Sequence, residues 1–141
     1  MKKTVMLLCL IMALVSCSKD NNSRNRNPYL PDISFAISLN TNLPQYSNLQ
    51  FPGNAIYIAN AGVRGLFVVN TGTSIRAWEA SDPNHTPSDC STMDLTGIDV
   101  TCSCEDTTYN LYTGLAVGVS LEYPLLEYRA DQSGNEIVIS N

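Results

Sequence analysis

The sequence predicts an all-β domain, an antiparallel β-sandwich or small barrel, that follows an export signal. Three observations predict this class. Short apolar or alternating segments recur along the chain, residues that form turns separate them, and no segment has the apolar period of a helix. The seven tyrosines and the many Val, Ile and Thr residues also favour strands. About 110 residues remain after the signal, which is enough for one domain with one core.

The expected strands follow one another in short order. Residues 33–39 alternate between apolar and polar side chains, as in a half-buried strand. Residues 65–70 are a nearly continuous apolar run, and a hairpin signal at 70–73 leads to the alternating residues 75–80. Residues 81–90 are rich in Pro, Asp, Asn and Ser and predict a loop. The remaining expected strands are residues 55–58, 97–102, 109–112, 125–130 and 136–139, with a turn at 133–135.

The N-terminus has the features of a bacterial lipoprotein signal. A basic start, Met1-Lys2-Lys3, precedes an apolar run at residues 5–15, which is too short to cross a bilayer of ~30 Å. The run ends in Leu14-Val15-Ser16-Cys17, which resembles the lipobox of bacterial lipoproteins. The resemblance implies that Cys17 carries a diacylglyceryl group and anchors the protein in a membrane. An ordinary signal peptide with a chance cysteine is the alternative.

These features divide the chain into three parts: a signal peptide at 1–16, a lipidated Cys17 with a polar tether at 17–29, and a β domain at 30–141. Ser18-Lys19-Asp20 resembles part of the export tag with which Bacteroidetes lipoproteins reach the cell surface. We therefore expect an outer-membrane lipoprotein of the cell envelope, facing the periplasm or the cell surface.

The charge of the mature chain excludes some partners. Removal of Lys2 and Lys3 leaves six basic and 13 acidic residues, so the formal net charge changes from −5 to −7. A nucleic-acid binder needs the opposite sign, and anionic lipid headgroups repel such a domain. We expect no nucleic acid, a membrane reached through the lipid alone, and an unidentified envelope protein or ligand as partner.

The order of motifs from Gly65 to Ile139 resembles that of Rieske domains. Those domains carry a Cys-x-His loop and a Cys-x-x-His loop, followed by an aromatic strand ending in Thr-Gly, a Pro-Leu-x-x-Tyr segment and a final strand. The matching segments here are Cys102-Ser103-Cys104-Glu105, Tyr109-Asn110-Leu111-Tyr112-Thr113-Gly114, Gly118, Pro124-Leu125-Leu126-Glu127-Tyr128 and Ile137-Val138-Ile139. The resemblance implies a Rieske-like fold with two adjoining loops, 81–95 and 102–108.

The resemblance also implies where cluster ligands would stand. A Rieske 2Fe–2S centre takes two thiolates and two imidazoles. The second loop offers Cys102 but has Glu105 in place of histidine, and the first loop has Asp82 and Asn84 at the ligand positions, with His85 one residue late. The chain has one histidine, so a site with two imidazoles is excluded. We expect no cofactor; the alternative is a 2Fe–2S electron carrier with unusual ligation by Cys102, Cys90, His85 and a carboxylate.

Three cysteines remain in the mature domain. In Rieske proteins of higher potential a disulfide joins the two loops, and by that resemblance Cys90 pairs with Cys104, with Cys102 as the alternative partner. The unpaired Cys102 would then be a buried inert residue or a redox-active thiol. A third possibility is a soft-metal site of Cys102, Cys104 and His85, which requires that the disulfide be absent.

Other candidate groups favour ordinary structural roles. His85 lies between two prolines and is expected to be solvated. Trp78 and the tyrosines are expected to pack in the sheet rather than to bind sugar. The acidic residues near the two loops are expected to be solvated rather than to bind Ca²⁺: Asp82, Asp89, Asp94, Asp99, Glu105 and Asp106. No acid–base pair or triad is present, so the expected function is a non-catalytic structural or partner-binding module.

Overall fold

The computed structural model describes residues 27–141. The predicted signal peptide, Cys17 and tether residues 18–26 lie outside this range. At its start the amide of Asn27 is buried and donates to the carbonyl oxygen of Pro83 at 2.7 Å. In residues 27–141 no helix is long and apolar enough to cross a membrane. The last residues of the expected tether, 27–29, are thus already packed against the domain at Asn27.

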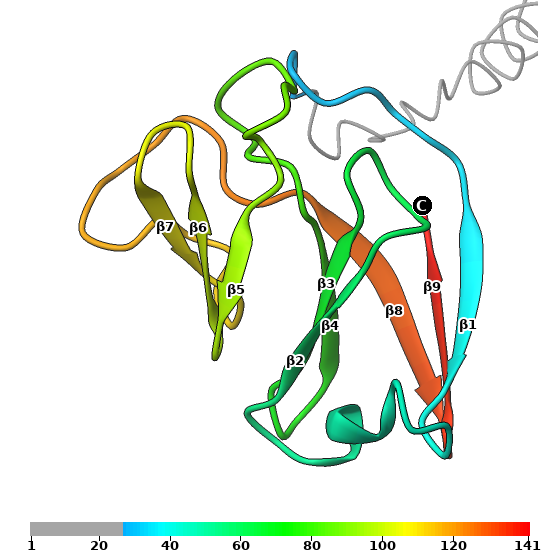
Figure 1. Ribbon diagram of the computed structural model, residues 1–141. Helices are drawn as coiled ribbons and strands as arrows, with labels where there is room; N and C mark the ends of the chain where they lie inside the picture. The colour runs from blue at the N-terminus through cyan, green and yellow to red at the C-terminus, as the bar shows by residue number, and fades with distance from the viewer. Residues whose placement is uncertain (1–26) are drawn as a thin grey trace, which may run out of the picture.

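Two antiparallel sheets make up the described part of the chain (Figure 1). A curled six-stranded sheet has the order β1-β9-β8-β4-β3-β2, and a three-stranded sheet has the order β5-β6-β7. A short 3-10 helix, Ser47–Gln50, precedes β2. The strands are β1 (Ala36–Asn40), β2 (Ala55–Ile58), β3 (Leu66–Asn70), β4 (Ile75–Glu79), β5 (Asp94–Thr96), β6 (Asp99–Cys102), β7 (Thr107–Asn110), β8 (Glu127–Ser133) and β9 (Glu136–Ser140).

Strands β3 and β4 separate two hydrophobic cores. Because side chains alternate across a strand, Leu66 and Val68 of β3 enter the core inside the curled sheet, while Phe67 and Val69 enter the core beneath the small sheet. All four side chains are at most 1% exposed. Burial on both faces explains why this segment is a continuous apolar run, and it makes β3 the centre of the fold.

The predicted all-β fold class, antiparallel with two adjoining loops, is confirmed. Several boundaries differ. The strand expected at 109–112 lies at 107–110, and the strand expected at 125–130 runs from Glu127 to Ser133, directly into the predicted turn. The three-residue strand β5 was not predicted, because Asp94-Leu95-Thr96 is too short to show a period.

Trp78 joins β4 to the small sheet. Its indole is 2% exposed and donates through Nε1 to the carbonyl oxygen of Leu111 at 2.8 Å, while the guanidinium of Arg76 lies 4.4 Å from the ring centroid. At Gly114, where φ is +73°, a Cβ atom would lie 2.5 Å from the indole. Glycine is therefore required there. The tryptophan packs in the core, as expected, and is not available as a sugar-stacking platform.

A buried carboxylate, Glu79, closes the end of β4. It is fully buried and accepts hydrogen bonds from the backbone N–H groups of Val63, Arg64 and Ser81 at 2.7, 2.8 and 3.0 Å. The hydroxyl of Tyr128 donates the fourth, at 2.8 Å. Four donors compensate for the loss of hydration, so this charge holds the loop before β3 against β8.

We expect this network to limit stability at high pH. Burial raises the pKa of Tyr128, and the nearby Glu79 carboxylate raises it further. A folded-state pKa above the unfolded value of about 10 gives stability that is complete below about pH 10 and is lost as the pH rises towards the folded pKa. The free energy of unfolding, measured with urea from pH 8 to 12, should fall above about pH 10, and Tyr128→Phe should reduce the slope. An unchanged slope in the variant would contradict this assignment.

Candidate functional site

The two loops predicted to adjoin meet at one end of the small sheet. The first leaves β4 and is closed at its base by backbone hydrogen bonds, from Asp82 N–H to Ser91 O at 3.0 Å and from Met93 N–H to Ala80 O at 3.0 Å. The second is the four-residue turn between β6 and β7, in which Asp106 has a φ of 52°. Aspartate tolerates this left-handed conformation. The tight turn presents Cys104 to the first loop.

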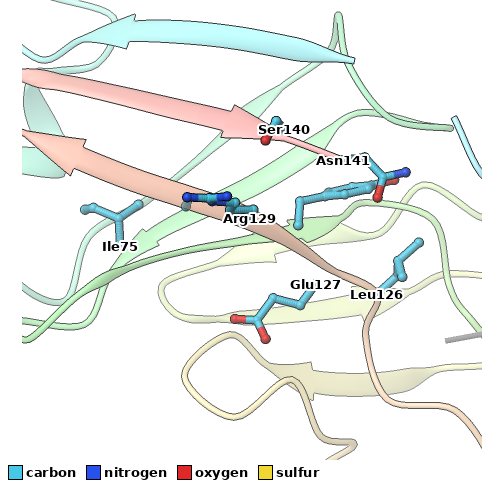
Figure 2. Close-up of a pocket in the computed structure, with 8 residues that line it drawn as sticks. Ile75, Leu126, Glu127, Arg129, Ser140 and Asn141 are labelled. Carbon is cyan, nitrogen blue, oxygen red and sulfur yellow. The ribbon is translucent and has the colours of Figure 1, made fainter. Parts of the chain in front are cut away.

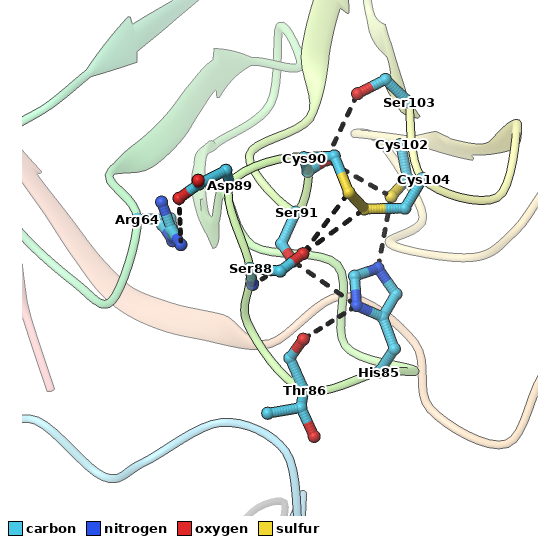
Figure 3. Close-up of a disulfide and its surroundings, with 10 residues drawn as sticks. All are labelled: Arg64, His85, Thr86, Ser88, Asp89, Cys90, Ser91, Cys102, Ser103 and Cys104. Atoms are coloured by element: carbon cyan, nitrogen blue, oxygen red, sulfur yellow. Dashed lines mark hydrogen bonds and ion pairs between the residues drawn. A yellow bond between two sulfur atoms is a disulfide. The ribbon is translucent and has the colours of Figure 1, made fainter.

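A disulfide between Cys90 and Cys104 joins the loops (Figure 3). The Cα atoms of the pair are 5.3 Å apart, within the normal range. Ser103 Oγ donates to the carbonyl oxygen of Cys90 at 3.3 Å, which adds a second link between the loops. Cys90 is exposed and Cys104 partly buried, so the bond lies at the surface. The pairing is the one implied by the resemblance, and the alternative with Cys102 is not formed.

Cys102 lies directly beneath the disulfide. It is the free cysteine of the described residues and is fully buried. Its Sγ is 3.4 Å from His85 Nε2 and 3.9 Å from the carbonyl oxygen of Cys90. Burial raises the pKa of the Cys102 thiol, and the nearby Asp82 carboxylate also raises it, against the lowering effect of the backbone N–H groups of Cys104 and Glu105. A protonated thiol is a poor nucleophile, so the disulfide above it resists exchange at neutral pH.

Alkylation measures this protection. In the oxidised protein at neutral pH, iodoacetamide should modify Cys102 at least about ten times more slowly than free cysteine, because the thiol is buried and protonated. The rate should rise only as the pH exceeds the ordinary thiol pKa of about 8.5. Mass spectrometry of the peptide that contains Cys102 gives the rate. Modification as fast as that of free cysteine would show that the thiol is open to solvent.

His85 differs from its prediction. Instead of being solvated, its imidazole is partly buried and turned toward Cys102. The other ring nitrogen, Nδ1, lies 3.1 Å from the carbonyl oxygen of Thr86 and 3.4 Å from Ser91 Oγ. A carbonyl oxygen can only accept, so Nδ1 carries the proton in this contact and Nε2 presents its lone pair to the thiol.

The two first-loop ligand positions are occupied by a hydrogen-bond network. Asp82 is fully buried, and its Oδ1 accepts from the N–H of Asn84 at 2.8 Å and from the hydroxyl of Tyr109 at 3.1 Å. Asn84 Nδ2 donates to Tyr109 Oη at 3.0 Å and to the carbonyl oxygen of Tyr123 at 2.8 Å, and its Oδ1 accepts from Tyr123 N–H at 3.1 Å. Both amide atoms of Asn84 thus serve to fix the loop. Asp82 Oδ2 and Ser81 Oγ are the buried side-chain atoms left without a partner in residues 27–141.

The residues at the four ligand positions differ from the two thiolates and two imidazoles of a Rieske 2Fe–2S cluster. Such a cluster requires two donors on each iron. Of the four positions, Cys102 offers a thiol, Asp82 and Asn84 are engaged in the hydrogen-bond network, and Glu105 is exposed on the turn. In the alternative ligand set, Cys90 is bonded to Cys104. Within that alternative set, the side chains of His85 and Cys102 are in contact.

The acidic side chains are dispersed rather than gathered. Asp89 is exposed and faces Arg64 at 3.9 Å, and Asp99 accepts from Asn110 Nδ2 at 2.7 Å. Within residues 27–141, three potential metal ligands lie close together, and they are His85, Cys102 and Cys104.

A pocket of about 640 Å³ lies on the large sheet, away from the cysteines (Figure 2). Strands β4 and β8 pair only at Ala77–Tyr128 and Trp78–Glu127, after which β8 turns to pair with β9. The separation leaves a hollow beside Ile75 and Arg129. Its lining does not include the candidate residues of the two loops.

An exposed aliphatic segment borders the small sheet. Residues 115–121 follow β7, and Ala116 forms a bridge with Tyr109 while Val117 N–H donates to Thr108 O at 2.8 Å. The exposed side chains are Leu115, Val117, Val119 and Leu121, which are 37–57% exposed. Backbone pairing holds the first part of this segment, Ala116 and Val117, on the domain.

Comparisons with known proteins give only distant likenesses. No family model matches the chain, and no curated protein matches it. Similar solved structures include a complex of reduced oxygenase and oxidized ferredoxin in carbazole 1,9a-dioxygenase (18% identity, 78% of this chain and 94% of that chain, TM-score 0.49). A second is the ferredoxin of carbazole 1,9a-dioxygenase from Nocardioides aromaticivorans (18% identity, 65% of this chain and 90% of that chain, TM-score 0.44). A third is a putative NADH-dependent nitrite reductase small subunit from Mycobacterium tuberculosis (16% identity, 78% of this chain and 97% of that chain, TM-score 0.46). With values this low, the fold assignment rests on the strand order and the two loops.

Proposed function

We propose that this chain is a membrane-anchored, Rieske-like protein of the bacterial cell envelope in which a disulfide holds together the two loops that a cluster would join. Its role is that of a structural or partner-binding module rather than an enzyme. The observation that carries the proposal is the disulfide from Cys90 to Cys104, placed between the two loops. The motif order from Gly65 to Ile139 supplies the resemblance, and Cys17 supplies the anchor.

The chemistry of the first loop supports this reading. Asp82 and Asn84, at the positions of a thiolate and an imidazole, bind Tyr109 and Tyr123 instead of facing an open site. A network of this kind stabilises the loop without metal, because each hydrogen bond to a buried partner replaces one lost to water. Together with the disulfide it makes the paired loops rigid, which suits a surface that a partner recognises.

The aliphatic surface at residues 115–121 is the part of the domain that we assign to a partner. Contiguous exposed apolar side chains are uncommon on soluble monomers and often mark sites of protein interaction. The excess of acidic over basic residues in the mature chain favours a partner with a basic rim around its apolar contact. The partner would be another protein of the envelope.

The first experiment is a spectrum with chemical analysis of the full chain, extracted from bacterial membranes. The protein should require detergent for extraction, be colourless, contain no iron or labile sulfide, and release Cys90 and Cys104 for alkylation only after reduction. Cys17→Ala should move the protein to the soluble fraction. A brown protein with about two irons per chain and labile sulfide would overturn the proposal. It would instead support a 2Fe–2S electron carrier with unusual ligation.

A further inference from the structure

Three side chains with metal-binding atoms meet where the loops join. The ligand atoms of His85, Cys102 and Cys104 all lie within 4.8 Å of one another, and they come from both loops (Figure 3). The proposed function does not use them together, since it treats Cys104 as half of a disulfide and Cys102 as inert.

Their spacing is close to that of a tetrahedral zinc site. Zn–N and Zn–S bonds of about 2.0 and 2.3 Å at tetrahedral angles place nitrogen and sulfur about 3.5 Å apart, and two sulfurs about 3.8 Å apart. His85 Nε2 and Cys102 Sγ are 3.4 Å apart, so an ion could bind both with a small outward shift. Imidazole and thiolate are the donors that zinc prefers.

The surroundings of two of these residues are those of metal ligands. The contact from Nδ1 of His85 to the carbonyl oxygen of Thr86 fixes the tautomer in which Nε2 is free to bind a metal. Cys102 is fully buried beside that nitrogen, so a metal–thiolate bond there would be shielded from water. Cys102 is buried, while His85 and Cys104 are partly exposed, so the ion has a path from solvent.

The fourth ligand follows from the disulfide. Cys90 Sγ is bonded to Cys104 Sγ, so reduction of the disulfide frees a second thiol beside that of Cys104. We propose that the reduced domain binds one zinc ion through these four side chains, one imidazole and three thiolates, and that the disulfide and the zinc ion are alternative links between the same two loops.

The exchange requires a reductant, which we identify as a dithiol. The dithiol transfers two electrons and two protons to the Cys90–Cys104 bond, giving two thiols and its own disulfide. Zinc then displaces one proton from each of the three thiols and takes the lone pair of the neutral imidazole. The reverse exchange uses the disulfide form of the dithiol as oxidant and three protons from water. It re-forms the Cys90–Cys104 bond, regenerates the dithiol, reprotonates Cys102 and releases the ion.

Cobalt(II) provides the test, because its tetrahedral thiolate complexes are coloured. The protein is the full chain in detergent with Cys9→Ser and Cys17→Ser, so that the three domain cysteines are the only thiols. After anaerobic reduction and removal of the dithiol, one Co²⁺ per chain should give charge-transfer and d–d bands, and one Zn²⁺ should abolish them. The oxidised protein should bind Co²⁺ at least about 100-fold more weakly.

Matched variants identify the ligands. Cys102→Ser and His85→Ala should each weaken binding by roughly 100-fold or more, since each removes one of four ligands. Asp106→Asn, an exposed change in the same turn at a left-handed position that asparagine also tolerates, should leave binding unchanged. Equal binding by the oxidised protein, or full binding by Cys102→Ser, would overturn the proposal. The proposal would also be overturned if the Co²⁺ bands appeared only under conditions in which Trp78 fluorescence shows that the chain is unfolded.

The cobalt experiment and the iron analysis can fail independently of each other. A protein isolated with iron and sulfide refutes the proposed function whatever it does with cobalt. A colourless protein that binds no Co²⁺ when reduced and folded refutes the zinc site and leaves the proposed function in place.

Discussion

Glu79→Ala is expected to lower the free energy of unfolding by about 4 kcal/mol or more. The substitution leaves one buried and two partly buried backbone N–H groups without an acceptor, at about 1–3 kcal/mol each, and the relief of burying a charge offsets only part of this. The hydroxyl of Tyr128 also loses its acceptor. Urea unfolding at pH 7, followed by Trp78 fluorescence, measures the loss.

Two variants show whether the hydrogen bonds are the cause. Glu79→Gln keeps the size but offers one acceptor oxygen and an amide that opposes the N–H donors, so an intermediate loss is expected. Glu122→Ala, an exposed acid on the surface, should change stability by no more than about 0.5 kcal/mol. A loss below about 1 kcal/mol in Glu79→Ala would mean that water replaces the carboxylate at little cost.

The second large effect is expected from the disulfide. A Cys90→Ala, Cys104→Ala double variant should lose about 3 kcal/mol, because the bond closes a loop of about 15 residues and limits the unfolded chain. The bond spans a sequence separation of 14. Urea unfolding of the oxidised protein and the variant gives the difference, and amide hydrogen exchange should show that the loss of protection begins in residues 82–91.

Reduction of the wild type in metal-free buffer should reproduce most of this loss. Cys102→Ala is the matched control, since it removes a buried thiol from the same place without breaking the cross-link, and it should cost less than the double variant. If the double variant is as stable as the wild type, the hydrogen bonds of Asp82 and Asn84 alone are sufficient to hold the loops.

The sequence predicted the centre of the fold better than its edges. Residues 65–70 and 75–80 were expected as strands and lie in β3 and β4 within one residue, because apolar side chains from both strands enter the two cores. The polar end of β8, Ala130–Ser133, has no such pattern, since its pairing with β9 comes from the backbone and much of it faces solvent. The 3-10 helix at 47–50 likewise has no periodic signal.

The site was predicted in part. The resemblance placed Asp82, Cys102 and the disulfide at the loop junction, whereas the inward turn of His85 depends on its contact with Thr86, which spacing alone does not give. The role of Glu79 was missed. Its signal was present, because in an alternating strand it shares the face of Ile75 and Ala77, which are buried. A charge on an apolar face indicates a buried network.

The same network fixes one glycine position before β3, and the ring of Tyr57 fixes a second. At Gly62, where φ is +72°, a Cβ atom would lie 2.5 Å from Glu79 Oε2, and at Gly65, where φ is +101°, it would lie 2.5 Å from the ring of Tyr57. The close approach of this loop to the carboxylate is what allows two consecutive backbone N–H groups to reach it.

The chain leaves the large sheet after β4 and returns to it at β8, and the two crossing points are adjacent. The N–H of Glu79 donates to the carbonyl oxygen of Leu126 at 2.8 Å. Residues 80–126 are thus an insertion with neighbouring ends, a small module mounted on a frame whose own strand pairing does not pass through it. Substitutions within residues 80–126, such as a cysteine pair in place of metal ligands, therefore leave the strand pairing of the large sheet unchanged. For protein engineering, this makes the segment a natural unit for grafting between chains of the same architecture.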